Sequence, residues 1–262
     1  MFPNKTTMLI DGGGQLQFGA RQPKNGEAEV FTPDRRSIGE AVVSEYLWWR
    51  GLDHIDYIAA THADADHIAG LTDVVRNFSV RMALVGRTPS DDKEYERFAQ
   101  SLKRESVPLE VISGGDILRA GEVEIEVLWP PPTSYASAPY RNNDSLVLRI
   151  QHKRRSVLLT GDVEASAERQ LLLRRHESLA SDVVKVAHHG SRTSSTERFV
   201  EAVQPSIAVI SVGQASPYGH PAQEVMERWE QQGAQVLTTG SAGTITVMTD
   251  GDNLQLETFV PR

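Results

Sequence analysis

The 262-residue sequence contains no cysteine, which excludes disulfide bonds, a thiolate nucleophile and thiolate metal ligands. Any metal must therefore bind to nitrogen and oxygen atoms. Long apolar runs are missing as well. The longest, at 155–161 and 206–212, have the length of strands and fall short of the roughly 20 residues that span a bilayer. The first residues lack the apolar core of a secretion signal. We therefore expect no membrane insertion by this chain, and no targeting signal indicates its cellular compartment.

Positive charge is also scarce. Lys and Arg number 27 against 35 Asp and Glu, a formal net charge of −8, which argues against a generally basic surface for nucleic acid. Two local patches remain candidates for phosphate binding: "HKRRS" at 152–156, with Lys153, Arg154 and Arg155, and Arg192. The hydrophobic fraction of 39% is ordinary for a globular protein.

Short β-branched runs alternate with longer amphipathic segments, which predicts one α/β domain over residues 1–262. The polar stretch 19–36 and the proline-rich stretch 129–140 are interpreted as connections inside that domain, because patterns typical of strands lie on both sides of each. We expect strands at 6–12, 55–61, 81–86, 109–113, 123–129, 145–150, 156–161, 183–188, 207–212 and 244–249, and helices at 38–50, 67–77, 92–104, 164–179, 195–203 and 221–232.

Four side chains that can bind metals occupy six positions in "THADADHIAG": His62, Asp64, Asp66 and His67. An apolar strand ends just before them and an amphipathic helix begins within them, so Asp66 and His67 should lie at the positive end of the helix dipole. A solvated acidic turn or a calcium loop is the alternative. Imidazoles are poor calcium ligands, and the EF-hand spacing is absent, so the pattern favours a transition-metal site.

Other His and Asp residues follow strands. Asp11 stands before three glycines, Asp162 ends "VLLTGD", His188 and His189 end "KVAHH", and His220 lies in "YGHP". Each alone reads as a turn residue. Strand ends on one edge of a sheet converge, however, so together they predict one metal site. We expect His54, His152 and His176 at the surface and the Trp48–Trp49 pair in the core.

The segments "LIDGG", "THADADHIAG", "LLTGD" and "HHGS", in this order, resemble the metallo-β-lactamase superfamily. Within it the chain looks most like the C-terminal domain of ComEC competence proteins, the DNA-uptake channel family, which shares "NDSLVL" at 143–148, "KVAHHGS" and "GHP". The resemblance implies a four-layer αββα sandwich. The family's first strand is expected to be missing here or supplied otherwise, since "LIDGG" follows so closely on Met1.

The resemblance also implies two divalent metal ions, Mn²⁺ or Zn²⁺, and a role for each matching residue. His62 and Asp64 would bind the first ion and Asp66 and His67 the second, while Asp162 would bridge them. His189 would complete the ligand set, although His188 and His189 can exchange roles. The remaining roles are second-shell support by Asp11 and Asn143, acid–base catalysis by Asp66, His188 and His220, and substrate binding by Ser191 and Arg192.

Two positions depart from the commonest family form, which has histidines where Asp64 and the segment 142–145 stand. An oxygen-rich site moves metal preference from zinc toward manganese. The implied activity is hydrolysis of DNA phosphodiester bonds. The rivals are a small-molecule phosphodiesterase, phosphocholine esterase or lactonase, and a non-catalytic, metal-stabilised binding domain. If the resemblance extends to the whole gene product, its partner is a membrane channel domain and its location extracytoplasmic; otherwise a cytoplasmic location is expected.

Overall fold

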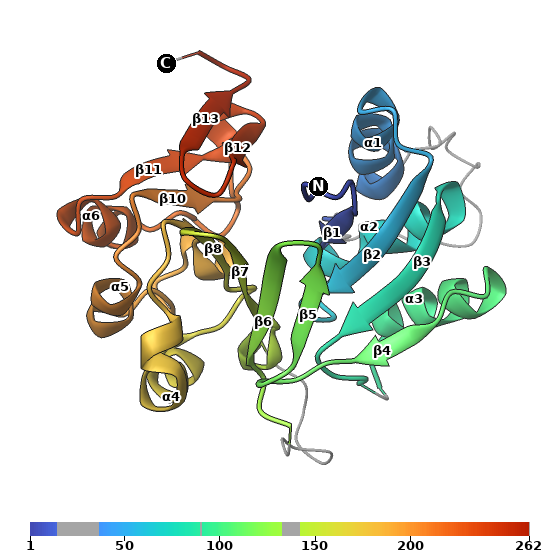
Figure 1. Ribbon diagram of the computed structural model, residues 1–262, viewed down its shortest axis with the longest axis horizontal. Coiled ribbons are helices and arrows are strands. Elements are labelled where there is room, and N and C mark those ends of the chain that lie inside the picture. The colour runs from blue at the N-terminus through green and yellow to red at the C-terminus, as the bar shows by residue number, and fades with distance from the viewer. Residues whose placement is uncertain (15–36, 90, 133–141, 262) are drawn as a thin grey trace, which may run out of the picture. The chain divides into compact units, whose positions relative to one another are not determined.

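The computed structural model describes residues 1–14, 37–89, 91–132 and 142–261. The polar connection at 19–36 and most of the proline-rich stretch 129–140 lie outside these residues. The described chain forms two compact units. We call Thr7–Glu110 the N-terminal unit, and Met1–Thr6 together with Val111–Arg262 the C-terminal unit. Each consists of a sheet with helices, so the expected α/β class is confirmed (Figure 1).

The N-terminal unit is built on a four-stranded sheet in the order β1-β2-β3-β4, in which β1, β2 and β3 are parallel. Its core joins the sheet to the apolar face of α2, with Ile58, Leu71 and Val74 fully buried. A π-helical segment, Gly39–Ser44, leads directly into α1. The elements are β1 (Met8–Ile10), α1 (Glu45–Trp49), β2 (His54–Ala60), α2 (Ala65–Asn77), β3 (Ser79–Val85), α3 (Lys93–Arg104) and β4 (Leu109–Val111).

The C-terminal unit is built on a seven-stranded sheet in the order β11-β10-β9-β8-β7-β6-β5. Strands β8 to β11 are parallel and β5 to β8 antiparallel. The strands are β5 (Ile117–Ala120), β6 (Val123–Trp129), β7 (Val147–His152), β8 (Arg155–Leu159), β9 (Val183–Lys185), β10 (Ile207–Ile210) and β11 (Gln235–Thr238), and the helices are α4 (Ala165–Arg175), α5 (Glu197–Val203), α6 (Gln223–Gln231) and α7 (Thr239–Ala242).

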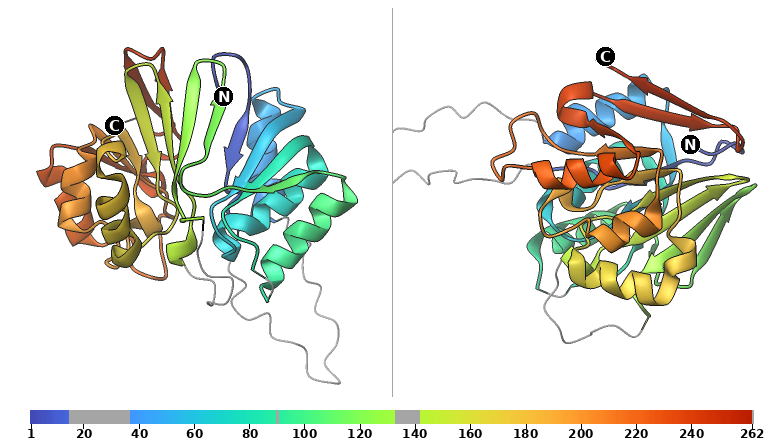
Figure 2. Two further views of the ribbon diagram at one scale, coloured as in Figure 1. Left: turned by 60° about the horizontal axis from the view of Figure 1, so that its bottom comes forward. Right: turned by 90° about the vertical axis from the view of Figure 1, so that its left-hand side faces the viewer.

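Side chains alternate across this sheet and so build two cores. Leu158, Val184 and Ala208 pack with α4, α5 and α6, the helices that Figure 2 shows together on one face. Val183 and Ile207 belong to a second cluster with the antiparallel hairpin β12 (Ile245–Thr249) and β13 (Leu254–Thr258). The helices hold one face of the sheet and the hairpin covers part of the other.

Several local expectations were wrong. Trp48 and Trp49 are 45% and 79% exposed and do not form part of the core, because α1 is short and only its Leu47 is buried. His152 is buried, since it ends β7, with its Nε2 atom 3.9 Å from Glu122. Among the described helices, none combines the length and the apolar composition that crossing a bilayer requires.

Candidate functional site

The predicted ligands fall into one group in each unit. We call Asp11, Thr61, His62, Asp64, Asp66 and His67 the N-terminal donor group, and Lys185, His188, His189, Asp162 and Ser211 the C-terminal donor group. Parallel strands position both. Asp11 follows β1 and Thr61 follows β2, while Asp162, His188 and Ser211 follow β8, β9 and β10. Within each unit, therefore, the ends of neighbouring parallel strands bring these side chains together.

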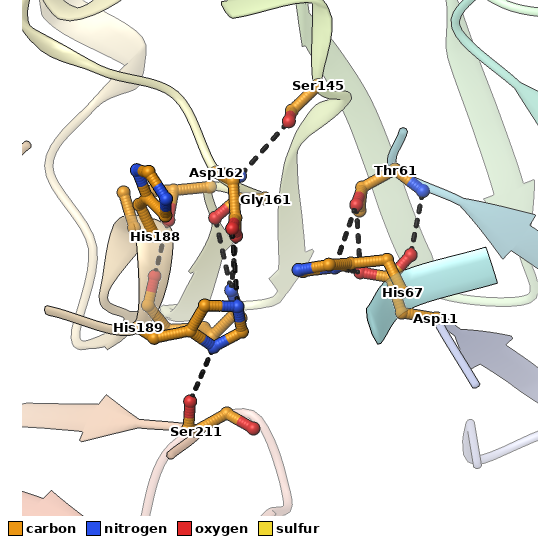
Figure 3. Close-up of polar contacts among 12 residues, drawn as sticks. Asp11, Thr61, His67, Ser145, Gly161, Asp162, His188, His189 and Ser211 are labelled. Atoms are coloured by element: carbon orange, nitrogen blue, oxygen red, sulfur yellow. Dashed lines mark hydrogen bonds and ion pairs between the residues drawn. The ribbon is translucent and has the colours of Figure 1, made fainter. Parts of the chain in front are cut away.

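The N-terminal donor group is organised around the carboxylate of Asp11. This carboxylate accepts hydrogen bonds from the backbone N–H and the hydroxyl of Thr61, both at 2.8 Å, and lies 2.7 Å from Nδ1 of His67 (Figure 3). Burial raises the pKa of Asp11. The pKa is lowered by the charge and the hydrogen bond of His67, by the charge of His62 and by the Thr61 N–H. Together these effects outweigh burial, so the pKa of Asp11 lies below its usual value. The carboxylate is therefore ionised and acts only as an acceptor.

That protonation state fixes the tautomers of both histidines. Nδ1 of His67 must donate to Asp11, so in the neutral ring the lone pair lies on Nε2. Thr61 gives its proton to Asp11, so its oxygen accepts from Nδ1 of His62 at 3.0 Å. Nε2 of His62 then also carries a lone pair, and it is buried without a hydrogen-bond partner in the described part of the chain. The two rings lie with centroids 4.1 Å apart.

Glycines bring Asp11 to this position. The loop after β1 rests on the first turns of α2, where Gly12 N–H bonds to the His67 carbonyl at 2.7 Å and Gly70 N–H bonds to the Gly13 carbonyl at 2.8 Å. A Cβ atom on Gly70 would lie 2.0 Å from the Gly12 carbonyl oxygen, and one on Gly12 would lie 2.4 Å from the Leu71 nitrogen. Glycine at positions 12 and 70 therefore allows the loop after β1 to approach the backbone of α2 closely.

Asp64 and Asp66 flank the start of α2. Asp64 is the N-cap residue, has a half-exposed side chain and lies with Oδ2 3.7 Å from Nε2 of His62. Asp66 stands in the first helical turn. Asp66 thus lies at the positive end of the helix dipole, as expected.

The C-terminal donor group holds a second pair of facing acceptors. Nδ1 of His189 lies 2.7 Å from the Ser211 carbonyl, which only accepts, so this nitrogen carries the proton. The other nitrogen, Nε2, lies 3.3 Å from Oδ2 of Asp162 (Figure 3). In the neutral ring a lone pair there faces a carboxylate oxygen, whereas the protonated ring forms an ion pair with Asp162. Asp162 is buried, and its Oδ1 lies 3.5 Å from Nζ of Lys185.

The loop that presents the two histidines has unusual backbone angles. His188 and His189 both have positive φ, 49° and 52°, a region that residues other than glycine rarely adopt. Such local strain persists only where the surroundings hold it and is frequent at functional sites. Here the hydroxyl of Ser194 holds the loop, since it donates to the carbonyls of Ala187 and Ser191, both at 3.0 Å.

His188 and His220 form a pair beside this loop, with ring centroids 5.8 Å apart. Burial lowers the pKa of His220, and the charges of His188, His189 and Arg192 lower it further, against an opposing effect of Asp162. Nδ1 of His188 lies 3.2 Å from the Thr193 hydroxyl and 3.4 Å from the Glu164 carboxylate. Both rings therefore have polar partners or charged neighbours, as proton-transfer groups need.

The other predicted residues have structural contacts. The side chain of Asn143 accepts from Glu164 N–H at 2.8 Å, and its carbonyl accepts from Trp129. Asn142, which sequence reasoning missed, is the asparagine whose side chain reaches His188, at 3.4 Å. Ser191 is buried with its hydroxyl 3.1 Å from Thr193. Its role in binding substrate, like that of Arg192, stays a prediction.

Two further residues escaped the sequence analysis. Lys185 was predicted only as part of a strand, yet its ammonium group lies beside Asp162; its spacing of four residues before His189 in "KVAHH" was the available signal. Glu168 is fully buried on α4 and accepts from the backbone N–H groups of Ser195 and Thr196. Burial raises the pKa of Glu168, while those hydrogen bonds and Arg228 oppose the rise.

The basic segment "HKRRS" is engaged in the fold. Nζ of Lys153 donates to the Asp250 carbonyl at 3.3 Å, and Arg154 pairs with Asp252 at 2.9 Å. Arg155 pairs with Asp182 at 2.7 Å. The segment begins β8, whereas Asp162 lies beyond the other end of that strand, seven residues from Arg155 or roughly 23 Å of extended chain. These cations hold the turn of the β12–β13 hairpin.

The donor sets fit a divalent metal. Nitrogen lone pairs on His62, His67 and His189 are directed by a hydrogen bond on the opposite ring nitrogen, which is the usual arrangement of metal-binding histidines. The surrounding carboxylates are Asp64, Asp66 and Asp162. A set of imidazoles and carboxylates without thiolates suits zinc, manganese or iron.

Comparison with known proteins identifies relatives. The family model described as "Metallo-beta-lactamase superfamily" matches residues 2–214. ComE operon protein 3 of Bacillus subtilis (strain 168) is 32% identical over 238 residues, which cover 91% of this chain and 29% of that protein. Recombination protein 2 of Haemophilus influenzae is 25% identical over 224 residues, 84% of this chain and 26% of that protein. The chain spans less than a third of the length of these curated relatives.

Among solved structures, the metallo-hydrolase Igni18 from Ignicoccus hospitalis has a TM-score of 0.49 and 17% sequence identity, covering 79% of this chain and 81% of that chain.

Proposed function

Because the chain belongs to the metallo-β-lactamase superfamily of metal-dependent hydrolases, we propose that it hydrolyses phosphodiester bonds of DNA with two divalent cations. The observation that carries the proposal is the set of directed tautomers. The Asp11 carboxylate leaves Nε2 of His67 and, through Thr61, Nε2 of His62 as lone-pair donors. Nε2 of His62 is buried without a hydrogen-bond partner in the described part of the chain, and a protein that only needed a stable core would have paired such an atom.

We propose that both donor groups bind the same pair of cations. His62 and Asp64 would hold one ion, Asp66, His67 and His189 would hold the other, and Asp162 would bridge them. This assignment follows the order of the family motifs along the chain. It also agrees with the geometry within the C-terminal unit, where Nε2 of His189 lies 3.3 Å from Oδ2 of Asp162.

When bound, the two cations would lower the pKa of a water molecule and polarise the oxygens of the phosphodiester. The protein's own groups have separate tasks. Asp11 holds the ring of His67 in its tautomer, and Ser211 does the same for His189. His188 or His220 would hold the proton that the leaving oxygen takes up.

DNA is proposed as the substrate because the relatives carry names of competence and recombination proteins. The acidic net charge of −8 favours the second candidate, a small-molecule phosphodiesterase, phosphocholine esterase or lactonase. A non-catalytic binding domain is the third. It is disfavoured because a structural metal site is closed by four ligands, whereas six candidate ligands are present here.

The test compares single-stranded DNA, duplex DNA and bis-p-nitrophenyl phosphate as substrates with Mn²⁺, Zn²⁺ and Mg²⁺. We expect cleavage of DNA, strongest with Mn²⁺ because the ligand set is rich in oxygen, and none from Asp162→Asn. If the protein hydrolyses the small ester but leaves both forms of DNA uncut with every metal, the nuclease proposal fails and the small-molecule esterase becomes the better proposal. Two bound metals without any turnover would favour the binding domain.

We also propose that the native gene product joins this chain to a membrane channel domain, since it aligns to only 29% of ComE operon protein 3. Sequencing the reading frame upstream of Met1 tests this. Hydrophobic segments of roughly 20 residues are expected there, and a stop codon directly upstream would contradict the proposal.

A further inference from the structure

The C-terminal unit contains a groove between α4 and α5 with a volume of about 1230 Å³. The two helices lie side by side on the helical face of the seven-stranded sheet (Figure 2). Ala165 opens α4 and bonds through its N–H to the Thr193 carbonyl at 2.9 Å, and both residues line the groove. One end of the groove therefore lies where the chain leaves Asp162 and the histidine loop, and it extends from there along both helices.

Arginines line this groove from both sides. Arg169 projects from α4 and Arg198 from α5, both are exposed, and neither has an ion-pair partner among the described residues. Arg192 lies at the loop end, 3.6 Å from Glu224, and Arg228 donates to the Ser195 carbonyl. Four guanidinium groups in one groove are notable in a chain with a net charge of −8, and guanidinium matches phosphate in geometry and charge.

We propose that this groove binds the sugar–phosphate backbone of a single DNA strand that extends from the hydrolytic site. This inference rests on the proposed function for the identity of the ligand. The walls are neighbouring helices, whose axes in packed pairs lie about 8–10 Å apart, which suits one strand and excludes a duplex. Leu172 and Ala202 supply apolar surface for the sugars. Phe, Tyr and Trp are absent from the lining among the described residues, so the groove offers no aromatic ring on which bases could stack and would contact the backbone.

Three glutamates also line the groove, and they limit its affinity. Glu197 and Glu201 are shared with a smaller acidic recess of about 270 Å³ that includes Glu224 and Glu227. The third is Glu177. Helix α5 thus separates a groove rich in arginine from an acidic recess. Removing a groove glutamate should strengthen binding, whereas a purely steric groove would not respond to its charge.

The experiment measures fluorescence anisotropy of a labelled, phosphorothioate-linked thymidine oligonucleotide with the metal-loaded protein. This probe keeps one negative charge per linkage and resists cleavage. The double variant Arg169→Gln/Arg198→Gln should bind about tenfold more weakly at 0.1 M salt, with a log–log salt slope shallower by about 1.4, because each phosphate contact on a single strand contributes about 0.7. Glu201→Gln should bind more tightly.

Matched controls are Arg174→Gln, an exposed arginine of α4 that does not line the groove, and Arg154→Gln in the β7–β8 turn. Both should bind like the unmodified protein. Hydrolysis of bis-p-nitrophenyl phosphate should be unchanged in the groove variants, because that ester is too short to extend into the groove. Unchanged thermal melting of each variant excludes unfolding as the cause of weaker binding.

The outcomes separate the two proposals. If the protein cleaves DNA but the double variant binds the oligonucleotide with normal affinity, the proposed role of the groove is wrong and the proposed nuclease activity stands. If the groove variants change oligonucleotide affinity as expected but the protein hydrolyses no phosphodiester, the proposed nuclease activity is wrong and strand binding by the groove stands. If an oligoglutamate peptide of equal charge displaces the oligonucleotide at lower concentration, the occupant is an acidic protein segment and the strand assignment is wrong.

Discussion

The carboxylate of Asp11 lies 2.7 Å from Nδ1 of His67, 56 residues further along the chain. Asp11 follows β1 and His67 opens α2, so the contact exists only after β1 has paired with β2 and α2 has packed on the loop between them. A proton on Nδ1 of His67 is thereby fixed, and in the neutral ring the lone pair lies on Nε2. Folding of the N-terminal unit and preparation of its donor group are the same event.

Asp11→Asn should weaken divalent metal binding by about 10–100-fold, the usual effect of removing a hydrogen-bond partner of a ligating histidine. The amide cannot accept from Thr61 and His67 as strongly, so both imidazoles lose their fixed tautomers. Competition with a chromophoric chelator measures the affinity. Asp53→Asn is the matched control, because Asp53 pairs with His54 at 2.8 Å on the exposed surface. Equal affinity in both variants would rule out the supporting role of Asp11.

His67→Ala should bind at most one metal equivalent, against two for the unmodified protein. The variant loses the nitrogen that Asp11 directs, while Asp64 and His62 remain. Elemental analysis after reconstitution and gel filtration gives the ratio, and His54→Ala, an exposed histidine, should keep two equivalents. An unchanged ratio in His67→Ala would remove this residue from the ligand set.

Gly70→Ala should destabilise the protein by more than about 3 kcal/mol, in the range that only steric conflict or lost networks reach. Its Cβ would lie 2.0 Å from the Gly12 carbonyl oxygen, and the loop that carries Asp11 would have to move away from α2. Urea unfolding measures the loss. Gly213→Ala is the control, since nothing lies within 4 Å of a Cβ there, and a similar small effect in both would show that the loop adapts freely.

The donor residues were predictable from sequence because strand periodicity and polar residues at strand ends are local signals. The start of α2 near Asp66, the parallel strands before Asp162 and His188, and the glycines after Asp11 all follow from such patterns. The pairing of Asp11 with His67 was predictable only as general support for a ligand. Which nitrogen each ring presents depends on Thr61, whose hydroxyl bridges Asp11 and His62 and carries no distinctive signal in the sequence.

The errors have physical causes as well. Strands β5, β11 and β13 were missed because their exposed faces dilute the apolar pattern, as in Leu254–Thr258, where partly buried and exposed residues alternate. Trp48 and Trp49 were placed in the core by hydrophobicity alone, and burial depends on which helix face meets a neighbour. The cations of "HKRRS" were interpreted as a free patch because Asp252 and Asp182, their partners, are distant in sequence.

Asp162→Asn should retain its circular dichroism spectrum and lose nearly all hydrolysis. The side chain lies at the end of β8, outside the apolar clusters that hold the sheet, so folding does not require its charge. Lys185 lies 3.5 Å from Oδ1 and His189 lies 3.3 Å from Oδ2, and an amide would present a donor to one of them. Turnover of bis-p-nitrophenyl phosphate is the measurement. An active Asp162→Asn protein would refute the bridging role.

Glu168 provides a prediction about pH. Its carboxylate holds the backbone N–H groups of Ser195 and Thr196, beyond the histidine loop. Burial, the largest influence, raises the pKa of Glu168 above the ordinary glutamate value of 4.5. The native state therefore keeps this proton to a higher pH than the unfolded chain does. Stability from this group is fully present below about pH 4.5 and is lost as pH rises through the native pKa.

Glu168→Gln removes this titration and also one of two acceptors, so it should unfold more easily by about 1–3 kcal/mol at acidic pH. The difference in unfolding free energy between the unmodified protein and the variant should shrink as pH rises above about 4.5, because only the unmodified protein then carries a buried charge. Urea unfolding across a pH series measures this difference. Glu230→Gln, an exposed glutamate, should track the unmodified protein at every pH. A difference for Glu168→Gln that widens with rising pH would show that the native carboxyl prefers its ionised form, and the assigned direction of its pKa would be wrong.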